Sequence, residues 1–191
     1  MESESFVVLA SRSPRRVELL KQLVTDFSVV PADIDETPHS HEDPVSYVKR
    51  LALEKARAVY MVSDSSAIVI GADTTVDLDG DIFGQPADDN DAREMLRRLS
   101  GTTHQVHTGV AVVNATGEEV EVVSSSVTFL DLRPEIVEWY IGTGESVGKA
   151  GSYAIQGHGS ALVASSVGSM SNIIGLPLEE TARLLGVPAP K

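Results

Sequence analysis

The stretch Phe6-Val-Val-Leu-Ala-Ser-Arg-Ser-Pro-Arg-Arg16 contains the signals that decide the fold class. Its first five residues are apolar and rich in β-branched side chains, which predicts a buried strand over 6–10. Ser13 is a favourable N-cap residue and Pro14 suits the first position of a helix, so we expect a helix from Pro14 to about Leu23. A strand that leads directly into a helix is typical of α/β sheets.

The alternation of strands and helices continues along the chain. We expect strands over 27–30, 67–78, 106–114 and 119–130, helices over 44–62, 89–99, 134–141 and 177–185, and a glycine-rich segment over 142–159. No repeat, linker or low-complexity tract separates these elements, so residues 1–191 are expected to form a single domain. We predict a mixed α/β fold in which helices flank a twisted mixed sheet and two lobes enclose a cleft.

The charge balance limits the partners of the chain. It has 28 acidic and 15 basic residues, which gives a formal net charge of −13. A field of that sign opposes binding to nucleic acid or to an anionic membrane, since both attract basic surfaces. A small anionic substrate is compatible with it, provided that the few basic residues gather where the substrate binds.

The sequence also favours a cytoplasmic protein. Cysteine is absent, which excludes disulfides, thiolate zinc sites and cysteine nucleophiles and fits a reducing compartment. The N-terminal residues 1–5 are acidic, whereas a signal peptide begins with a basic region. The longest apolar runs are of strand length and too short to cross a membrane.

The junction between the first strand and the first helix is a candidate phosphate site, with Ser11, Arg12, Ser13, Arg15 and Arg16 close together. A helix N-terminus attracts anions, and guanidinium groups bind phosphate oxygens through paired hydrogen bonds. The alternative is a capped helix whose arginines are solvated. Because bases are scarce in this chain, three arginines within five residues favour substrate binding.

Lys55 interrupts an apolar stripe on the helix predicted over 44–62. The stripe includes Val48, Leu51, Ala52 and Val59 at helical spacing, and Lys55 falls in its middle. A lysine on the inner face either extends its ammonium group to solvent or meets a negative charge in a cleft. The sequence leaves these two alternatives evenly balanced.

Acidic side chains follow two of the predicted strands. Asp73 comes directly after an apolar run at the carboxyl end of a strand, where open α/β sheets bind ligands. Asp35 and Glu36 lie in the loop after another strand. Converging carboxylates would bind a hard divalent cation together with phosphate oxygens, or one would accept a proton from water. We favour a functional Asp73, whereas a solvated Asp35 and Glu36 remain a serious alternative.

The glycine-rich segment is a weaker candidate. Within 148–157, Lys149 offers a positive charge and Gln156 offers both a donor and an acceptor. Such an amide can read the edge of a pyrimidine. Glycine-rich loops with one lysine are common, so the pattern alone has little specificity.

Taken together, these segments resemble the Maf family of nucleoside triphosphate pyrophosphatases over about residues 8–185. The matching motifs are Leu9-Ala-Ser-Arg-Ser-Pro-Arg-Arg16, Leu53-Glu-Lys-Ala56, Gly71-Ala-Asp-Thr74, Leu99-Ser-Gly101 with His104, Thr108-Gly-Val110, Trp139-Tyr140, Thr143-Gly-Glu145, Lys149-Ala-Gly-Ser-Tyr-Ala-Ile-Gln-Gly157 and Gly175-Leu-Pro-Leu178. Each motif is short, but their order and spacing are highly specific. The resemblance implies a fold similar to the inosine triphosphate pyrophosphatases, with a nucleotide in the cleft between the lobes.

The resemblance also implies a reaction and roles for individual residues. A nucleoside triphosphate is cleaved between its α- and β-phosphates with the help of a divalent metal, Mg²⁺ or Mn²⁺. By position, Asp73 is the proton acceptor and a metal ligand, and Glu36 is a ligand of the metal or of water. Arg16, Lys55 and Lys149 match residues that face the phosphates. A homodimer is compatible with the family pattern.

Three positions resemble the branch of the family that acts on dTTP and UTP: Arg15, Thr74 and Gln156. The branch that acts on 7-methyl-GTP typically has tryptophan, glutamine and glutamate at these positions. Two residues depart from the usual family pattern, since Gln85 replaces a lysine and Gly148 replaces an aspartate. Two other functions are alternatives: a nucleotide-binding regulator of septum formation, and a pyrophosphatase for modified nucleotides.

Overall fold

The computed structural model describes residues 6–190, so the acidic N-terminal residues considered for targeting lie outside the described residues. Within that range the chain forms a seven-stranded mixed sheet in the order β2-β1-β3-β5-β6-β7, with β4 paired to β3. The strands are β1 (Phe6–Ala10), β2 (Phe27–Val29), β3 (Ala67–Leu78), β4 (Asp81–Phe83), β5 (Thr103–Asn114), β6 (Gly117–Phe129) and β7 (Val163–Val167). β1 is parallel to β2 and β3, and the other pairs are antiparallel.

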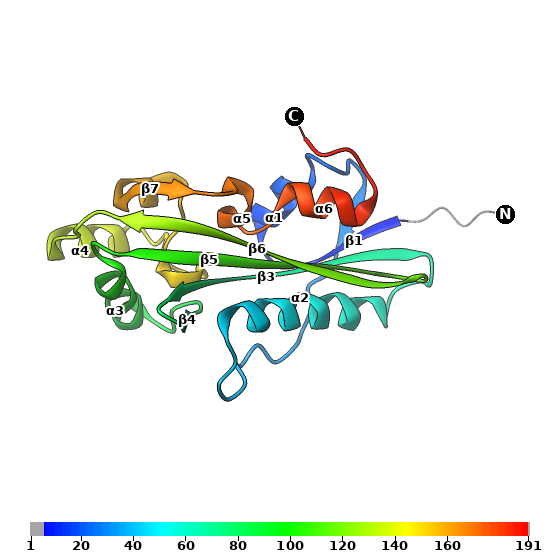
Figure 1. Cartoon of the computed structure of the whole chain (residues 1–191), viewed down its shortest axis with the longest axis horizontal. Helices are drawn as coiled ribbons and strands as arrows, with labels where there is room; N and C mark the ends of the chain where they lie inside the picture. The colour runs from blue at the N-terminus through cyan, green and yellow to red at the C-terminus, as the bar shows by residue number, and fades with distance from the viewer. Residues whose placement is uncertain (1–5, 191) are drawn as a thin grey trace.

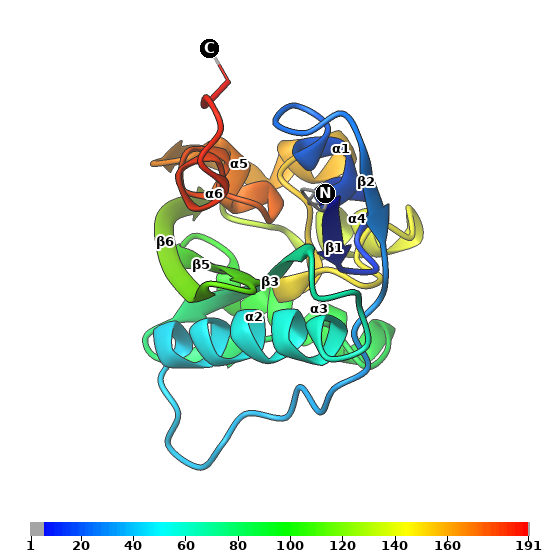
Figure 2. The same ribbon diagram turned by 90° about the vertical axis from the view of Figure 1, so that its right-hand side faces the viewer.

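Helices cover both faces of this sheet, which confirms the predicted mixed α/β fold. They are α1 (Pro14–Leu20), α2 (Pro44–Tyr60), α3 (Asp89–Leu99), α4 (Pro134–Gly142), α5 (Met170–Ile174) and α6 (Leu178–Leu185), with 3₁₀ turns η1 (Ala150–Ser152) and η2 (Gly157–Leu162). Figures 1 and 2 show α2 and α3 on one side of the long strands and α1, α5 and α6 on the other. None of the helices in residues 6–190 is long and apolar enough to cross a membrane.

At α1 and α2, two of the helices that begin with proline, the preceding residue forms the N-cap that the sequence indicates. The side chain of Ser13 accepts a hydrogen bond from the backbone N–H of Arg16, and Asp43 accepts from those of Val45 and Ser46. Three short elements, β4, β7 and α5, were not predicted. They span only three to five residues, too few for periodicity to distinguish them from loops. The first helix ends at Leu20, three residues earlier than predicted.

Two glycines allow α2 to lie directly on the sheet. A Cβ at Gly71 of β3 would lie 2.2 Å from the carbonyl oxygen of Ala52, and one at Gly109 of β5 would lie 2.3 Å from that of Val48. Neither distance leaves room for a side chain, so helix backbone contacts sheet backbone at both points. This close approach sets the height of Lys55 above β3.

Candidate active site

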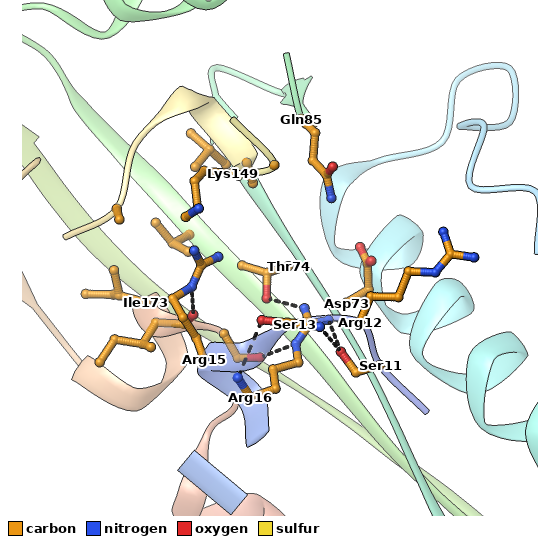
Figure 3. Close-up of a pocket in the computed structure, with 18 of the residues that line it drawn as sticks. Ser11, Arg12, Ser13, Arg15, Arg16, Asp73, Thr74, Gln85, Lys149 and Ile173 are labelled. Carbon is orange, nitrogen blue, oxygen red and sulfur yellow. Dashed lines mark hydrogen bonds between the residues drawn. The ribbon is translucent and has the colours of Figure 1, made fainter. Parts of the chain in front are cut away.

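A cavity of about 1110 Å³ opens beside the carboxyl end of β1, large enough for a ligand of nucleotide size. It brings together ten of the candidates from the sequence: Ser11, Ser13, Arg15, Arg16, Glu36, Lys55, Asp73, Thr74, Lys149 and Gln156. We call the residues of the β1–α1 turn, β3 and α2 in this cavity, together with Glu36, the floor, and residues 145–157 the wall. Figure 3 shows the arginines of the turn, Lys149 of the wall and Gln85 of the loop after β4 around the same cavity.

Lys55 meets two carboxylates at the floor. Its Nζ lies 2.7 Å from Asp73 Oδ1 and 2.9 Å from Glu36 Oε1. Lys55 and Asp73 are both buried, whereas the side chain of Glu36 is 47% exposed. The ammonium group is therefore not extended to solvent. Asp35 is exposed and accepts a hydrogen bond from the backbone N–H of Thr37 at 2.9 Å, so only Glu36 of the acidic loop pair reaches the site.

The position of Asp73 gives its carboxylate an unusual environment. It lies on β3 two residues beyond Gly71, the last residue of that strand to pair with β1. Burial raises the pKa of Asp73, while the neighbouring positive charges of Lys55 and Arg16 oppose that shift. A buried carboxylate with a raised pKa is a stronger base than a solvated one, which suits it to accept a proton.

Two of the three arginines are anchored towards the cavity. Arg16 donates from Nε to the carbonyl oxygen of Gly175 at 2.7 Å, and Arg15 donates from Nε to that of Ile174 at 3.3 Å. Burial lowers the pKa of both arginines. The outer nitrogens of each guanidinium remain on the side of the cavity (Figure 3). Arg12 differs, because its side chain is 74% exposed and lies 3.9 Å from Asp33 at the rim.

Hydroxyl groups bind Arg16 and join it to the sheet. Arg16 donates from Nη2 to Thr74 Oγ1 at 3.0 Å and from Nη1 to Ser11 Oγ at 3.4 Å. Thr74 Oγ1 also lies 2.9 Å from Thr108 Oγ1 on β5. Ser13 caps α1, so the capping and phosphate-binding interpretations apply to the same turn.

The wall places Lys149 and Gln156 on the side of the cavity that faces the floor. Arg15 and Gln156 line the cavity together with Ile173 and Ile174. Lys149 donates from Nζ to the carbonyl oxygen of Val147 at 3.1 Å, and burial lowers its pKa. A cationic floor thus faces a wall that carries one lysine and one amide.

Comparison with known proteins agrees with this geometry. The sequence profile of the family described as Maf-like protein matches residues 6–187. The chain belongs to the Maf family. This Maf family member is 51% identical over 191 residues to the dTTP/UTP pyrophosphatase of Anaeromyxobacter dehalogenans (strain 2CP-C), covering 96% of each chain. It is 51% identical over 190 residues to the dTTP/UTP pyrophosphatase of Myxococcus xanthus (strain DK1622), covering 98% of this chain and 96% of the relative.

A solved structure supports the fold of this Maf family member. The Ham1 protein of Staphylococcus aureus superposes with a TM-score of 0.50 at 18% sequence identity, over 65% of this chain and 72% of that chain. At that identity the likeness concerns the fold alone, and it agrees with the predicted two-lobed α/β architecture.

The donor set of the Maf site fits one mode of divalent metal binding. Residues 6–190 contain no group of three or more His, Cys, Asp or Glu side chains that could hold a metal. Asp73 and Glu36 do flank a common point, now bridged by the ammonium of Lys55. Mg²⁺ is commonly held by one or two carboxylates, with substrate phosphates completing its shell. The two carboxylates fit that mode, in which the nucleotide contributes to the metal site.

Two residues that support the site were not predicted from the sequence. Asn172 is fully buried and donates from Nδ2 to the carbonyl oxygen of Val106 and to Ser125 Oγ, while its own carbonyl accepts from Thr108 Oγ1. These bonds seat α5, whose C-terminal carbonyls hold the two arginines. Tyr47 donates from its hydroxyl to the carbonyl oxygen of Glu36 at 2.9 Å. Neither role has a local signal, because both depend on partners distant in sequence.

The two departures from the family pattern lie next to each other. A Cβ at Gly148 would lie 4.0 Å from Gln85 Oε1, and both residues line the cavity. An uncharged pair therefore stands where a lysine and an aspartate are usual.

Proposed function

We propose that this Maf family member hydrolyses dTTP and UTP to the nucleoside monophosphate and pyrophosphate. The observation that carries the proposal is the buried contact of Lys55 with Asp73, beside Glu36 and two anchored arginines in one nucleotide-sized cavity. The names of relatives that are half identical over nearly the full chain support the substrate class.

The chain's own residues supply positioning and charge. Arg15, Arg16 and Lys149 neutralise the triphosphate, because fixed cations near the phosphates stabilise charge that develops on the departing pyrophosphate. Asp73 accepts a proton from the attacking water as the bond between the α- and β-phosphates breaks. Lys55 keeps Asp73 ionised in its buried position and adds positive charge beside the phosphates.

A divalent metal is part of the proposal. Asp73 and Glu36 would hold Mg²⁺ or Mn²⁺ together with phosphate oxygens, in keeping with their shared position at the floor. When bound, the metal neutralises phosphate charge and stabilises the leaving pyrophosphate.

Base choice belongs to the part of the cavity lined by Arg15 and Gln156. An amide can donate to a carbonyl and accept from the ring N–H of uracil or thymine, which a carboxylate cannot do. The apolar side chains of Ile173 and Ile174, which line the same cavity, suit the face of a base.

The coarser parts of the proposal concern the whole chain. We propose that residues 1–191 form one domain that acts in the cytoplasm without nucleic acid, in agreement with its charge and lack of cysteine. A homodimer is the proposed alternative to a monomer, and light scattering after gel filtration measures which of the two is present.

A nucleotide panel tests the activity. Purified protein is incubated with dTTP, UTP, CTP, GTP and 7-methyl-GTP in Mg²⁺ or Mn²⁺, and both products are quantified. We expect equal amounts of monophosphate and pyrophosphate, fastest with dTTP and UTP. Tight binding without sustained turnover would favour the regulatory alternative, and a preference for 7-methyl-GTP would favour the modified-nucleotide alternative.

A further inference from the structure

The wall of the cavity has little regular structure of its own. Between α4 and η2 it contains only the three-residue turn η1, yet it carries Lys149 and Gln156. A segment of this kind keeps one shape only if long-range contacts fix it. The nature of those contacts decides how Lys149 and Gln156 are presented.

Glu145 joins the two ends of the wall. Its Oε1 accepts from the backbone N–H of His158 at 3.0 Å and lies 2.8 Å from His158 Nδ1. Its Oε2 accepts from the backbone N–H of Gly159 at 3.1 Å. The hydrogen bond from the His158 backbone is the main cause of a lowered pKa at Glu145. One carboxylate thus holds residues thirteen and fourteen positions further along the chain.

The backbone at this contact is shaped to the carboxylate. Gly157 has φ of +68°, which favours glycine, and a Cβ there would lie 2.5 Å from Glu145 Oε1. The bonds that hold the middle of the wall include two from backbone groups: the N–H of Ala154 donates to the Tyr140 hydroxyl at 3.1 Å, and that of Gly151 donates to the Gly84 carbonyl at 3.1 Å. Neither of these bonds fixes the end of the wall beside Gln156.

We propose that Glu145 is a positioning residue that closes the wall into a ring and so presents Lys149 and Gln156 to the substrate. The inference builds on the proposed function, because it assumes that a nucleoside triphosphate occupies the cavity. Without the closing contact, the wall samples more conformations and the substrate must order it on binding. Loss of Glu145 therefore weakens binding more than it slows chemistry at Asp73.

The principal test compares Glu145→Ala and Glu145→Gln with Glu138→Ala. Glu138 is a matched control on α4, where its carboxylate pairs with Arg93 outside the cavity. For Glu145→Ala we expect KM for dTTP to rise about tenfold or more, the equivalent of losing one or two hydrogen bonds, while kcat changes far less. Glu145→Gln should recover part of the loss, since its amide oxygen can still accept both bonds from His158 whereas its NH2 group cannot accept from Gly159. Glu138→Ala should match the parent.

Hydrogen exchange without nucleotide measures the ring directly. The amides of His158 and Gly159 should exchange faster in Glu145→Ala than in the parent, and remain protected in Glu138→Ala. Faster exchange supports the proposal even if the parent hydrolyses none of the nucleotides tested, in which case only the proposed function fails. Unchanged exchange in Glu145→Ala overturns the proposal, and unchanged exchange with reduced kcat would instead make Glu145 a direct substrate ligand.

A second variant tests the same contact without removing the charge of Glu145, and it remains informative if Glu145→Ala fails to fold. Gly157→Ala should disturb the same contact by steric conflict and raise KM in the same direction. If both residues act through one contact, the double variant should be little worse than either single variant. Fully additive effects of the two substitutions on KM would overturn the proposal that Glu145 closes the wall into a ring.

Discussion

The floor and the wall of the cavity are held in different ways. At the floor, Lys55 contacts two carboxylates, and Arg16 donates to Gly175, Thr74 and Ser11. At the wall, the Gln156 side chain makes no hydrogen bond within residues 6–190. The floor stands on paired strands and a helix that contacts the sheet, whereas the wall is an irregular segment. The groups for the chemical step are thus preorganised by the fold, and the group for base choice is left free to bond to a ligand.

The largest expected effect removes the proton acceptor at the floor. Asp73→Asn should lower turnover of dTTP by about 10²–10⁴-fold, the range found for general bases, because the amide cannot accept the proton. Circular dichroism should match the parent. The exposed Asp26→Asn is the control and should retain full activity. Near-parental turnover in folded Asp73→Asn would show that the floor is not the reaction centre.

The next prediction separates charge pairing from substrate contact at Lys55. If Lys55 met substrate phosphate alone, Lys55→Met would be expected to preserve or raise stability. The structure reverses that expectation, because the change leaves Asp73 buried without its partner, at a cost of about 3–5 kcal/mol. Turnover should also fall. Urea unfolding measures the stability, and Lys55→Met combined with Asp73→Asn should recover much of it; no recovery would mean that the two residues are not coupled.

A smaller effect is expected at the wall. Gln156→Glu should lower kcat/KM for dTTP and UTP by a factor equivalent to about 1–3 kcal/mol for one lost polar contact. Stability should not change, since the Gln156 side chain has no partner in the described part of the chain. The measurement is kcat/KM for the five nucleotides of the panel in parent and variant. A variant that keeps its pyrimidine preference would show that Gln156 does not read the base.

The effect that is smallest at neutral pH concerns the support beneath the wall, because it appears only in acid. His104 is buried with its Nε2 2.8 Å from the Tyr153 hydroxyl, and burial lowers its pKa to about 4. The unfolded chain binds a proton near the ordinary pKa of 6.5, so the free energy of unfolding falls as pH drops from about 6.5 to 4, by at most about 1.4 kcal/mol per pH unit. Urea unfolding of His104→Gln should show a shallower pH dependence than the parent. The exposed His39→Gln should keep the parental slope, and equal slopes for all three proteins would contradict the assignment.

The same contrast explains how much could be predicted from the sequence. The floor was predictable because local signals fix it: a serine cap with proline at the start of α1, and an aspartate directly after an apolar run. The partner of Lys55 could not be predicted, because it depends on how α2 lies against β3. The role of Glu145 could not be predicted from the sequence, because its partners lie thirteen or more residues away. Sequence motifs located Gln156 without indicating what holds its segment in place.

The glycine contacts beneath α2 have a consequence for how this protein can diverge. Because the carbonyls of Ala52 and Val48 rest on Gly71 and Gly109, the separation of helix and sheet is set by main-chain atoms. Mutations that exchange one core side chain for another of different volume can accumulate elsewhere without altering the reach of Lys55. Sequence change in the core therefore leaves the distance between Lys55 and Asp73 unaltered. In return, Gly71 and Gly109 have no room for a side chain.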